Sequence, residues 1–371
     1  MEQARITSPL AFIGPTMTDL AQLGFSDFFA AQVPPDQLPH TARIIAEHRG
    51  AFRIASATGE HAARISGRMR HLAETRGDLP AVGDWVLLRP TNSPADEAVI
   101  ETILERRSCF SRKAAGQTTS QQIVAANIDT VWIVTALDAD LSPRRIERYL
   151  TLAWESNASP AVILNKSDLC DDTPAAIAAI EAVSPGVRIH AVSALTGSNI
   201  EQLTPYIKPG ATVALLGSSG VGKSTLINRL AGRDIQATAG IRESDSKGRH
   251  TTTARQLITL PSGGLIVDTP GMRELQLWDA DSGVKDTFTD IEELAPHCRF
   301  SDCTHTSEPG CAVAQAIEEG TLTHERFASY QKLQAELAHL DRKQNAQLAA
   351  HEKKKHKAIS KLLRDHPKYK R

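Results

Sequence analysis

One segment, GSSGVGKST from Gly217 to Thr225, limits the possible folds of this chain more than any other feature. It matches the pattern G-x-x-x-x-G-K-[ST], follows the apolar run at 212–216 and precedes LINRLAG, whose apolar residues share one helical face. A strand, a glycine-rich turn and a helix in this order are typical of a phosphate-binding loop (P-loop). Backbone N–H groups would surround the phosphates, Lys223 would compensate their charge, and the Ser224 hydroxyl would ligate Mg²⁺. The residues predicted to contact the nucleotide are Gly217, Ser218, Ser219, Gly220, Val221, Gly222, Lys223, Ser224 and Thr225.

The apolar runs around this segment indicate what kind of sheet contains it. Five of them alternate with helical stretches, which is typical of a mainly parallel α/β sheet buried on both faces. They lie at residues 130–134, 161–164, 187–192, 212–216 and 264–267. We therefore expect an α/β P-loop domain over residues 123–280.

The motif DTPG, from Asp268 to Gly271, follows the last of these runs. At the carboxyl end of a strand, the Asp268 carboxylate can hold the Mg²⁺ shell, and the Gly271 N–H can meet the γ-phosphate of a nucleotide. Alone, DTPG would be an ordinary turn. After a P-loop, it predicts a metal-binding and switch element.

Two further motifs come before the P-loop, although they would bind the other end of a nucleotide. The first follows the run at 161–164, and the second follows the run at 187–192. They are NKSD, formed by Asn165, Lys166, Ser167 and Asp168, and SAL, formed by Ser193, Ala194 and Leu195.

These two motifs predict guanine as the base. The Asp168 carboxylate can accept hydrogen bonds from N1–H and N2–H₂ of guanine, which adenine does not offer. Asn165 can hold the guanine edge and the loop, the Lys166 stem can lie over the ring, and backbone N–H groups of 193–195 can donate to O6. A buried site that hydrogen-bonds the polar edge of its ligand rejects analogues lacking that edge. GTP is therefore the expected nucleotide, and GDP the product.

The group that would orient the attacking water is less well defined by the sequence. Met272 follows the DTPG motif, where many GTPases have a Gln, and its thioether cannot polarise water. His250, in the segment GRHTTT at 248–253, is the nearest candidate catalytic residue because an imidazole titrates near neutral pH. A contact with a partner, or a role in loop shape alone, remains an alternative for His250. We expect Thr252, in preference to Thr251, to complete the Mg²⁺ shell.

Three of the five cysteines lie close together with a histidine in the last quarter of the chain. Four N/S ligands with an excess of thiolates suit a tetrahedral structural Zn²⁺ with no open position. Free cysteines in a helical region are the alternative. The predicted ligands, spaced C-x₄-C-x-H-x₅-C, are Cys298, Cys303, His305 and Cys311.

The chain before the α/β domain divides into three parts by composition. Residues 1–41 are predicted to be an extension with a short helix at about 18–31 that is loosely attached. Short alternating runs over residues 42–111, separated by Gly, Pro, Asn and Asp, predict an OB-type barrel of about five strands. Such barrels often bind oligonucleotides, with a packing or spacer domain as the alternative. The polar residues 112–122 are predicted to be a linker.

The chain after the α/β domain is predicted to contain a zinc-binding helical module at 281–350 and a basic tail at 351–371. The tail has seven Lys and two Arg against one Glu and one Asp, although the whole chain has a net charge of −1. Such a charge run is either a solvated helix or a contact for RNA phosphates.

No run of 18 apolar residues and no signal-peptide pattern occurs in the sequence. We therefore expect a cytoplasmic protein without a membrane partner. We also expect it to be a monomer.

The order NKSD, SAL, GSSGVGKS, GRHTTT, DTPG resembles that of the circularly permuted GTPases, in which the base-recognition motifs precede the P-loop. Such permutation is tolerated where chain termini lie close together. With the preceding barrel and the following Cys/His cluster, the chain is similar to the family of ribosome small subunit-dependent GTPase A (RsgA, YjeQ or EngC). The resemblance covers about residues 40–315.

This resemblance implies a GTP hydrolase that binds the small ribosomal subunit and its rRNA and acts in late maturation, with the nucleotide state controlling association. The alternative is an RNA-binding nucleotide switch that acts on another structured RNA and whose turnover is incidental. A P-loop kinase or ATPase conflicts with the NKSD motif.

Overall fold

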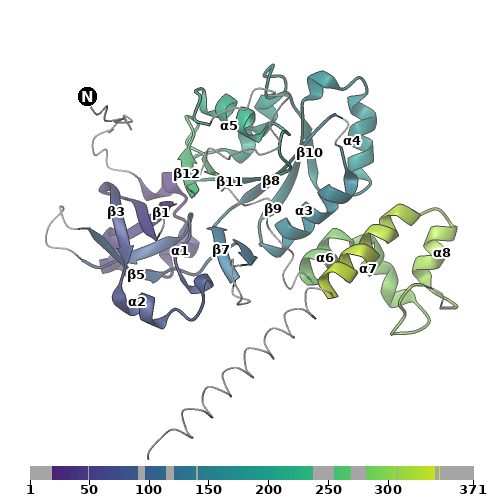
Figure 1. Cartoon of the computed structure of the whole chain (residues 1–371), viewed down its shortest axis with the longest axis horizontal. Helices are drawn as coiled ribbons and strands as arrows, with labels where there is room; N and C mark the ends of the chain where they lie inside the picture. Colours follow the sequence, from purple (N-terminus) through teal and green to yellow (C-terminus); the bar gives the residue numbers. More distant parts are fainter. Residues whose placement is uncertain are drawn as a thin grey trace, which may run out of the picture.

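The computed structural model describes residues 19–48, 50–90, 97–113, 121–138, 141–236, 255–268, 281–306, 308–338 and 342. A barrel, a helix-covered central sheet and a group of C-terminal helices follow one another along the chain (Figure 1). Among the described residues, no helix has both the length and the apolar character needed to cross a membrane.

The barrel has five strands, as the alternating runs predict. Antiparallel pairs join β1 to β2, β2 to β3, β1 to β4 and β4 to β5, and the parallel pair of β3 and β5 closes the ring. Ile44, Ile54 and Ile100 are fully buried. This pairing is that of an OB-type barrel, and the fold prediction for this part is confirmed. The strands are β1 (Thr41–His48), β2 (Ala51–Ser56), β3 (Gly59–Ile65), β4 (Trp85–Leu88) and β5 (Ala98–Ile103), with helix α2 (Gly67–Leu72) and the 3₁₀ turn η3 (Arg76–Asp78) between β3 and β4.

The segment before the barrel is not loosely attached over its described residues, so this expectation was wrong for them. Leu23 and Phe29 are buried, and the Phe29 ring lies 5.8 Å from that of Trp85. The aromatic side chains of this segment cover Trp85, and burial of this apolar surface holds the segment in place. It forms η1 (Leu20–Leu23), α1 (Asp27–Ala30) and η2 (Pro35–His40).

The central sheet has the strand order β10-β9-β8-β11-β13-β12, and among these described strands only β12 runs antiparallel to its neighbour. Its strands are β8 (Thr130–Ala136), β9 (Ser159–Asn165), β10 (Arg188–Ala191), β11 (Thr212–Leu216), β12 (Arg255–Thr259) and β13 (Leu265–Asp268). Strand β8 is buried over almost its whole length, as expected of a strand with both faces covered. The covering helices and turns are α3 (Pro143–Glu155), η4 (Ser167–Leu169), α4 (Thr173–Glu181), η5 (Ile200–Tyr206) and α5 (Lys223–Ala231).

The barrel and the central sheet are joined by strand pairing. Ala46 and Glu47 of β1 pair with Gln256 and Arg255 of β12, so the two parts form one continuous sheet. An ion pair of 3.1 Å between Arg255 and Glu47 accompanies this pairing.

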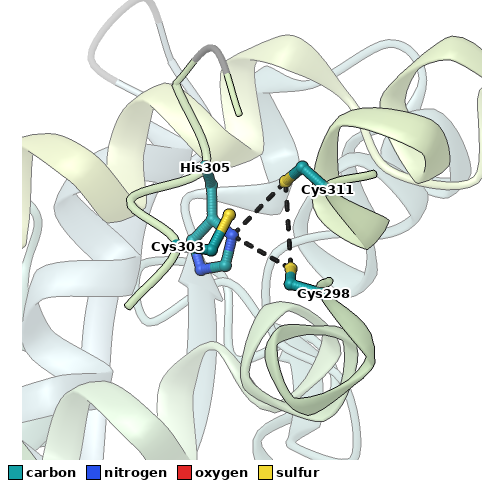
Figure 2. A group of neighbouring side chains, drawn as sticks. All are labelled: Cys298, Cys303, His305 and Cys311. Atoms are coloured by element: carbon teal, nitrogen blue, oxygen red, sulfur yellow. Dashed lines mark hydrogen bonds between the residues drawn. The ribbon is translucent and has the colours of Figure 1, made fainter. Parts of the chain in front are cut away.

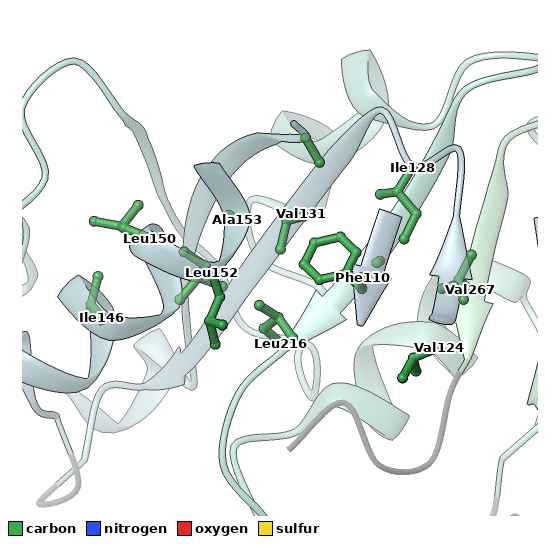
Figure 3. Packing of buried hydrophobic residues seen from close by; sticks show 14 of the residues in the cluster. Phe110, Val124, Ile128, Val131, Ile146, Leu150, Leu152, Ala153, Leu216 and Val267 are labelled. Atoms are coloured by element: carbon green, nitrogen blue, oxygen red, sulfur yellow. The ribbon is translucent and has the colours of Figure 1, made fainter. Parts of the chain in front are cut away.

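The residues predicted as a linker belong in part to a hairpin. Residues 112–113 end β6 (Cys109–Lys113), residues 121–122 begin β7 (Gln121–Ala126), and 114–120 lie outside the described residues. Phe110 of β6 belongs to the same buried cluster as Val131 and Leu216 of the central sheet (Figure 3). The hairpin is therefore packed against the α/β domain.

A buried arginine links the three N-terminal parts. Arg43 of β1 donates to the carbonyl oxygens of Leu23, Gly83 and Asn127 and to the Thr212 hydroxyl of β11. Burial lowers the pKa of Arg43 to about 10, so the guanidinium is still charged at neutral pH. These hydrogen bonds offset the cost of burying the charged Arg43 guanidinium inside the protein.

The C-terminal helices pack on α3. An added Cβ at Gly283 would overlap the Thr151 carbonyl oxygen, which shows how closely α6 approaches α3. Arg326 is buried and pairs with the buried Glu147 of α3 at 2.8 Å. The elements are α6 (Asp281–Thr287), α7 (Thr289–Leu294), η7 (Ala295–His297), α8 (Ala312–Glu318) and a helical stretch over 324–338.

Candidate functional site

The P-loop lies between β11 and α5, as predicted. Gly217 and Gly222 both have positive φ, of 149° and 93°. An added Cβ at Gly217 would overlap the Val134 carbonyl oxygen of β8, and one at Gly222 would overlap the Asn165 side chain. Only glycine therefore fits where the loop passes these neighbours.

Two cationic side chains form hydrogen bonds with the P-loop, one from its own motif and one from helix α3. Lys223 Nζ donates to the carbonyl oxygens of Gly217 (2.8 Å) and Ser218 (2.6 Å), so its ammonium lies across the loop. Arg145 Nη1 of α3 donates to the Ser218 hydroxyl at 2.6 Å. At the tip, Ser219 and Gly220 are exposed, which leaves their N–H groups accessible to a ligand.

One side chain joins the three predicted nucleotide-binding loops. Asn165, at the end of β9, is buried; its Nδ2 donates to the Val221 carbonyl oxygen at 2.8 Å, and its Oδ1 accepts from the Ala194 N–H at 2.9 Å. The NKSD motif, the P-loop and the SAL motif therefore meet at one edge of the sheet, where the parallel strands β9, β10 and β11 end. In α/β sheets this edge is where ligands bind.

The remaining NKSD residues differ in how they are held. Lys166 has a left-handed backbone (φ 60°), and its Nζ forms a 3.0 Å ion pair with Asp138, just beyond β8. Asp168 is exposed, and its carboxylate has no hydrogen bond or ion pair with any residue that the structure describes. Its acceptor oxygens can thus take donors from a ligand. Ser167, between them, is half-buried.

The SAL loop is braced by the helix that follows the P-loop. Arg229 of α5 donates to the carbonyl oxygens of Ala194 and Leu195. The Ser193 N–H donates to the Ser198 carbonyl oxygen and the Ala194 N–H to Asn165. These bonds fix the loop next to the P-loop helix.

The predicted metal and switch residues are only partly described. Asp268 ends β13, which runs parallel to the P-loop strand β11, so its backbone lies at the same sheet edge as the P-loop. Gly271, His250 and Thr252 lie outside the described residues. Ser224 and Thr225 are half-buried in the first turn of α5.

The four predicted zinc ligands converge (Figure 2). All four ligand atoms lie within 4.8 Å of one another. Cys298 Sγ lies 3.9 Å from Cys311 Sγ and 3.5 Å from His305 Nδ1, and Cys311 Sγ lies 3.4 Å from that nitrogen. Tetrahedral Zn²⁺, with Zn–S of about 2.3 Å and Zn–N of about 2.0 Å, would separate two sulfurs by about 3.8 Å and sulfur from nitrogen by about 3.5 Å. The donor set and the spacing both fit zinc.

Three residues that brace the site were not predicted: Asp138, Arg145 and Arg229. Asp138 and Arg145 follow β8, the strand that pairs with the P-loop strand β11. Polar residues directly after a strand next to the P-loop strand were the sequence signal that could have identified them. Arg229 lies in the second turn of α5, and the sequence prediction for this helix used only its apolar residues.

Comparison with known sequences gives consistent matches. A family model described as RsgA GTPase matches residues 103–278. The small ribosomal subunit biogenesis GTPase RsgA of Opitutus terrae is 48% identical over 352 residues, which cover 92% of this chain and 95% of the relative. RsgA 2 of Lactiplantibacillus plantarum is 47% identical over 321 residues, covering 86% of this chain and 90% of the relative.

Two solved structures resemble about four fifths of this chain. YjeQ from Thermotoga maritima, 28% identical, covers 81% of this chain and 98% of its own, with a TM-score of 0.61. YloQ, described as a circularly permuted GTPase, is 24% identical and matches with a TM-score of 0.57 over 80% of this chain and 94% of its own. The likeness to YloQ concerns the fold alone and confirms the permuted strand order.

Proposed function

The chain belongs to the RsgA GTPase family, and on that basis we propose that it hydrolyses GTP while bound to the small ribosomal subunit during late subunit maturation. Its curated relatives are named for small ribosomal subunit biogenesis. In this proposal the GTP or GDP state controls association with the subunit.

The observation that best supports a guanine nucleotide site is the position of Asn165. By bonding both Val221 and Ala194, it sets the base-binding loops at a fixed place relative to the P-loop. Asp168 then accepts from guanine N1–H and N2–H₂, and the Lys166 stem, held by its ion pair with Asp138, covers the ring. Since the N–H groups of Ser193 and Ala194 are used within the protein, we assign the O6 contact to the Leu195 N–H.

The phosphate end of the site uses the P-loop and the metal. N–H groups of the loop and Lys223 bind the phosphates, while Ser224 and Thr252 ligate Mg²⁺ and Asp268 holds its shell. Gly271 meets the γ-phosphate through its N–H. His250 orients the attacking water in place of the missing Gln.

The zinc module and the barrel are proposed to contact rRNA. A cleft of about 440 Å³ between the barrel and β7 has Phe52 and Ile65 among its apolar walls, and Arg70, Arg76 and Glu47 as its charged ones. Both arginines are exposed, and cations beside an apolar surface suit the phosphates and bases of RNA. The basic tail at 351–371 would add affinity that depends on salt. The protein is proposed to act as a cytoplasmic monomer with one structural Zn²⁺.

The test compares GTP hydrolysis by the full chain alone and with saturating isolated small subunits. We expect slow basal turnover that rises by about tenfold or more, because ordering of a switch segment completes the catalytic site. His250→Ala should keep GTP and subunit binding but lose most of the stimulation.

Equal rates with and without subunits, together with nucleotide-dependent binding of another RNA, would favour the switch with incidental turnover. Full stimulation of His250→Ala would contradict the role given to His250, and the water would have to be oriented by rRNA or another residue.

A further inference from the structure

One residue outside the P-loop motif forms a hydrogen bond with the P-loop. Arg145, in the first turn of α3, donates from Nη1 to the Ser218 hydroxyl at 2.6 Å. The carbonyl oxygen of the same Ser218 accepts from Lys223 Nζ, also at 2.6 Å. Arg145 therefore holds the side chain of Ser218, and Lys223 holds its backbone.

We propose that Arg145 is a positioning residue of the phosphate-binding loop, which fixes Ser218 and, through the Ser218 carbonyl oxygen, the ammonium of Lys223. This inference rests on the proposed function, since the phosphate contact of Lys223 belongs to it. Arg145 is not a member of the G-x-x-x-x-G-K-[ST] pattern and comes from a different part of the chain.

The physical reason is preorganisation. If a phosphate-binding loop becomes ordered only when the ligand binds, the entropy lost in ordering its backbone weakens binding. A loop that the protein already holds in the binding conformation avoids this loss. A guanidinium bound to a hydroxyl forms a charge-assisted bond, which is stronger than a neutral one. Arg145 also places a permanent positive charge beside a loop that must attract phosphate.

Arg145 is itself held in place by its helix. Two residues further along α3, Glu147 is buried and pairs with Arg326, and Arg148 pairs with Glu336 at 2.8 Å. Val134 of the preceding strand β8 approaches Gly217 so closely that no Cβ fits between them. Helix α3 thus begins beside the loop and is anchored at its next turn, so the Arg145 side chain starts from a fixed backbone.

The chain offers a matched control, because the neighbouring Arg144 is exposed while Arg145 is half-buried against the loop. The experiment measures affinity for fluorescent GDP and GTP, and basal kcat and KM, for Arg145→Met, Arg145→Lys, Ser218→Ala, the Arg145→Met/Ser218→Ala double variant and Arg144→Met. Circular dichroism melting shows whether each variant is folded.

Loss of one charge-assisted bond should weaken binding of both nucleotides by about tenfold in Arg145→Met. Ser218→Ala should have a similar effect, and the double variant should be no worse than the stronger single change, because both remove the same contact. Arg145→Lys should recover part of the affinity, and Arg144→Met should match the wild type.

Wild-type affinity in Arg145→Met, or equal losses in Arg144→Met and Arg145→Met, would overturn the inference. So would full additivity of Arg145→Met and Ser218→Ala, since Arg145 would then act without Ser218. Lack of hydrolysis by the wild type in all conditions would contradict the proposed function, whereas nucleotide affinities would still test the role of Arg145.

Discussion

Base selectivity in the proposed site depends on a single carboxylate, that of Asp168. Replacing it by an amide in Asp168→Asn substitutes a donor for one acceptor, which opposes guanine N2–H₂ but suits the carbonyl group that xanthine has at that position. We expect affinity for GTP to fall by about a hundredfold and preference to move toward xanthosine triphosphate, since polar groups of a bound ligand that are left unpaired weaken its binding strongly. Nucleotide titration of the variant measures both.

Asp172 provides a control, because it caps α4 through the Ala175 N–H and lies outside the NKSD motif. Asp172→Asn should leave nucleotide preference unchanged. If Asp168→Asn bound GTP as tightly as the wild type, the assignment of Asp168 to the guanine edge would be wrong.

The residues that sequence patterns identified belong to short motifs whose spacing indicates their chemistry. Asn165 and Lys223 lie within such motifs, although the bonds of Asn165 to Val221 and Ala194 join distant segments. Arg43 and Arg145 belong to no such motif, and their partners also lie in distant segments of the chain, so the sequence could not identify them. A charged residue in a sequence is normally expected on the surface, so Arg43 gave no sign that it would be buried.

Among the elements, the Cys/His loop between η7 and α8 gives the most direct test. In Cys303→Ala the remaining three ligands cannot complete a tetrahedral shell, so zinc content should fall and the local helices should loosen. GTP affinity should be retained, because the P-loop and base loops do not include this segment. Metal analysis of the purified protein measures the zinc content, and nucleotide titration measures the GTP affinity.

Cys170→Ala is the matched control, since Cys170 lies apart from the cluster in the sequence and should not change zinc content. Full zinc occupancy in Cys303→Ala would remove Cys303 from the ligand set.

Strands were predictable where burial is complete or alternation is regular. The runs at 130–134 and 212–216 became β8 and β11, and the alternating runs of the barrel became strands as well. Strand β12 and the hairpin of β6 and β7 were not predicted. RQLIT is too short, and SRKAAGQTTSQQ too polar, for a clear period. RQLIT and the described ends of the second segment, 111–113 and 121–122, are strands because a neighbouring strand supplies the backbone partners.

For the molecule as a whole, we expect the barrel and the α/β domain to unfold together, because Arg43 bonds residues of both. In Arg43→Met the carbonyl oxygens of Leu23, Gly83 and Asn127 lose a donor while remaining buried. We expect the free energy of unfolding to fall by about 3 kcal/mol, the cost of leaving buried acceptors unpaired. Calorimetry should show the single transition of the two parts separate into two.

Arg53→Met removes an exposed ion pair with Glu60 on the same barrel and should change stability little. An unsplit transition at the wild-type temperature in Arg43→Met would mean that strand pairing of β1 with β12 suffices to couple the two parts.

The strand order also determines how the sheet can be completed while the chain is being synthesised. β8, β9 and β10 leave the ribosome in sequence and lie side by side, so each joins the free edge left by the one before. β11 then joins the opposite edge at β8, and the hairpin of β12 and β13 can follow as a unit, with β1 of the barrel already made. Because nascent chains generally fold from the N-terminus, no strand that the structure describes has to enter between two that are already paired. In this permuted order the predicted base-binding loops are translated before the P-loop, and we expect the nascent domain to hold a nucleotide only after β11 and the P-loop have been added.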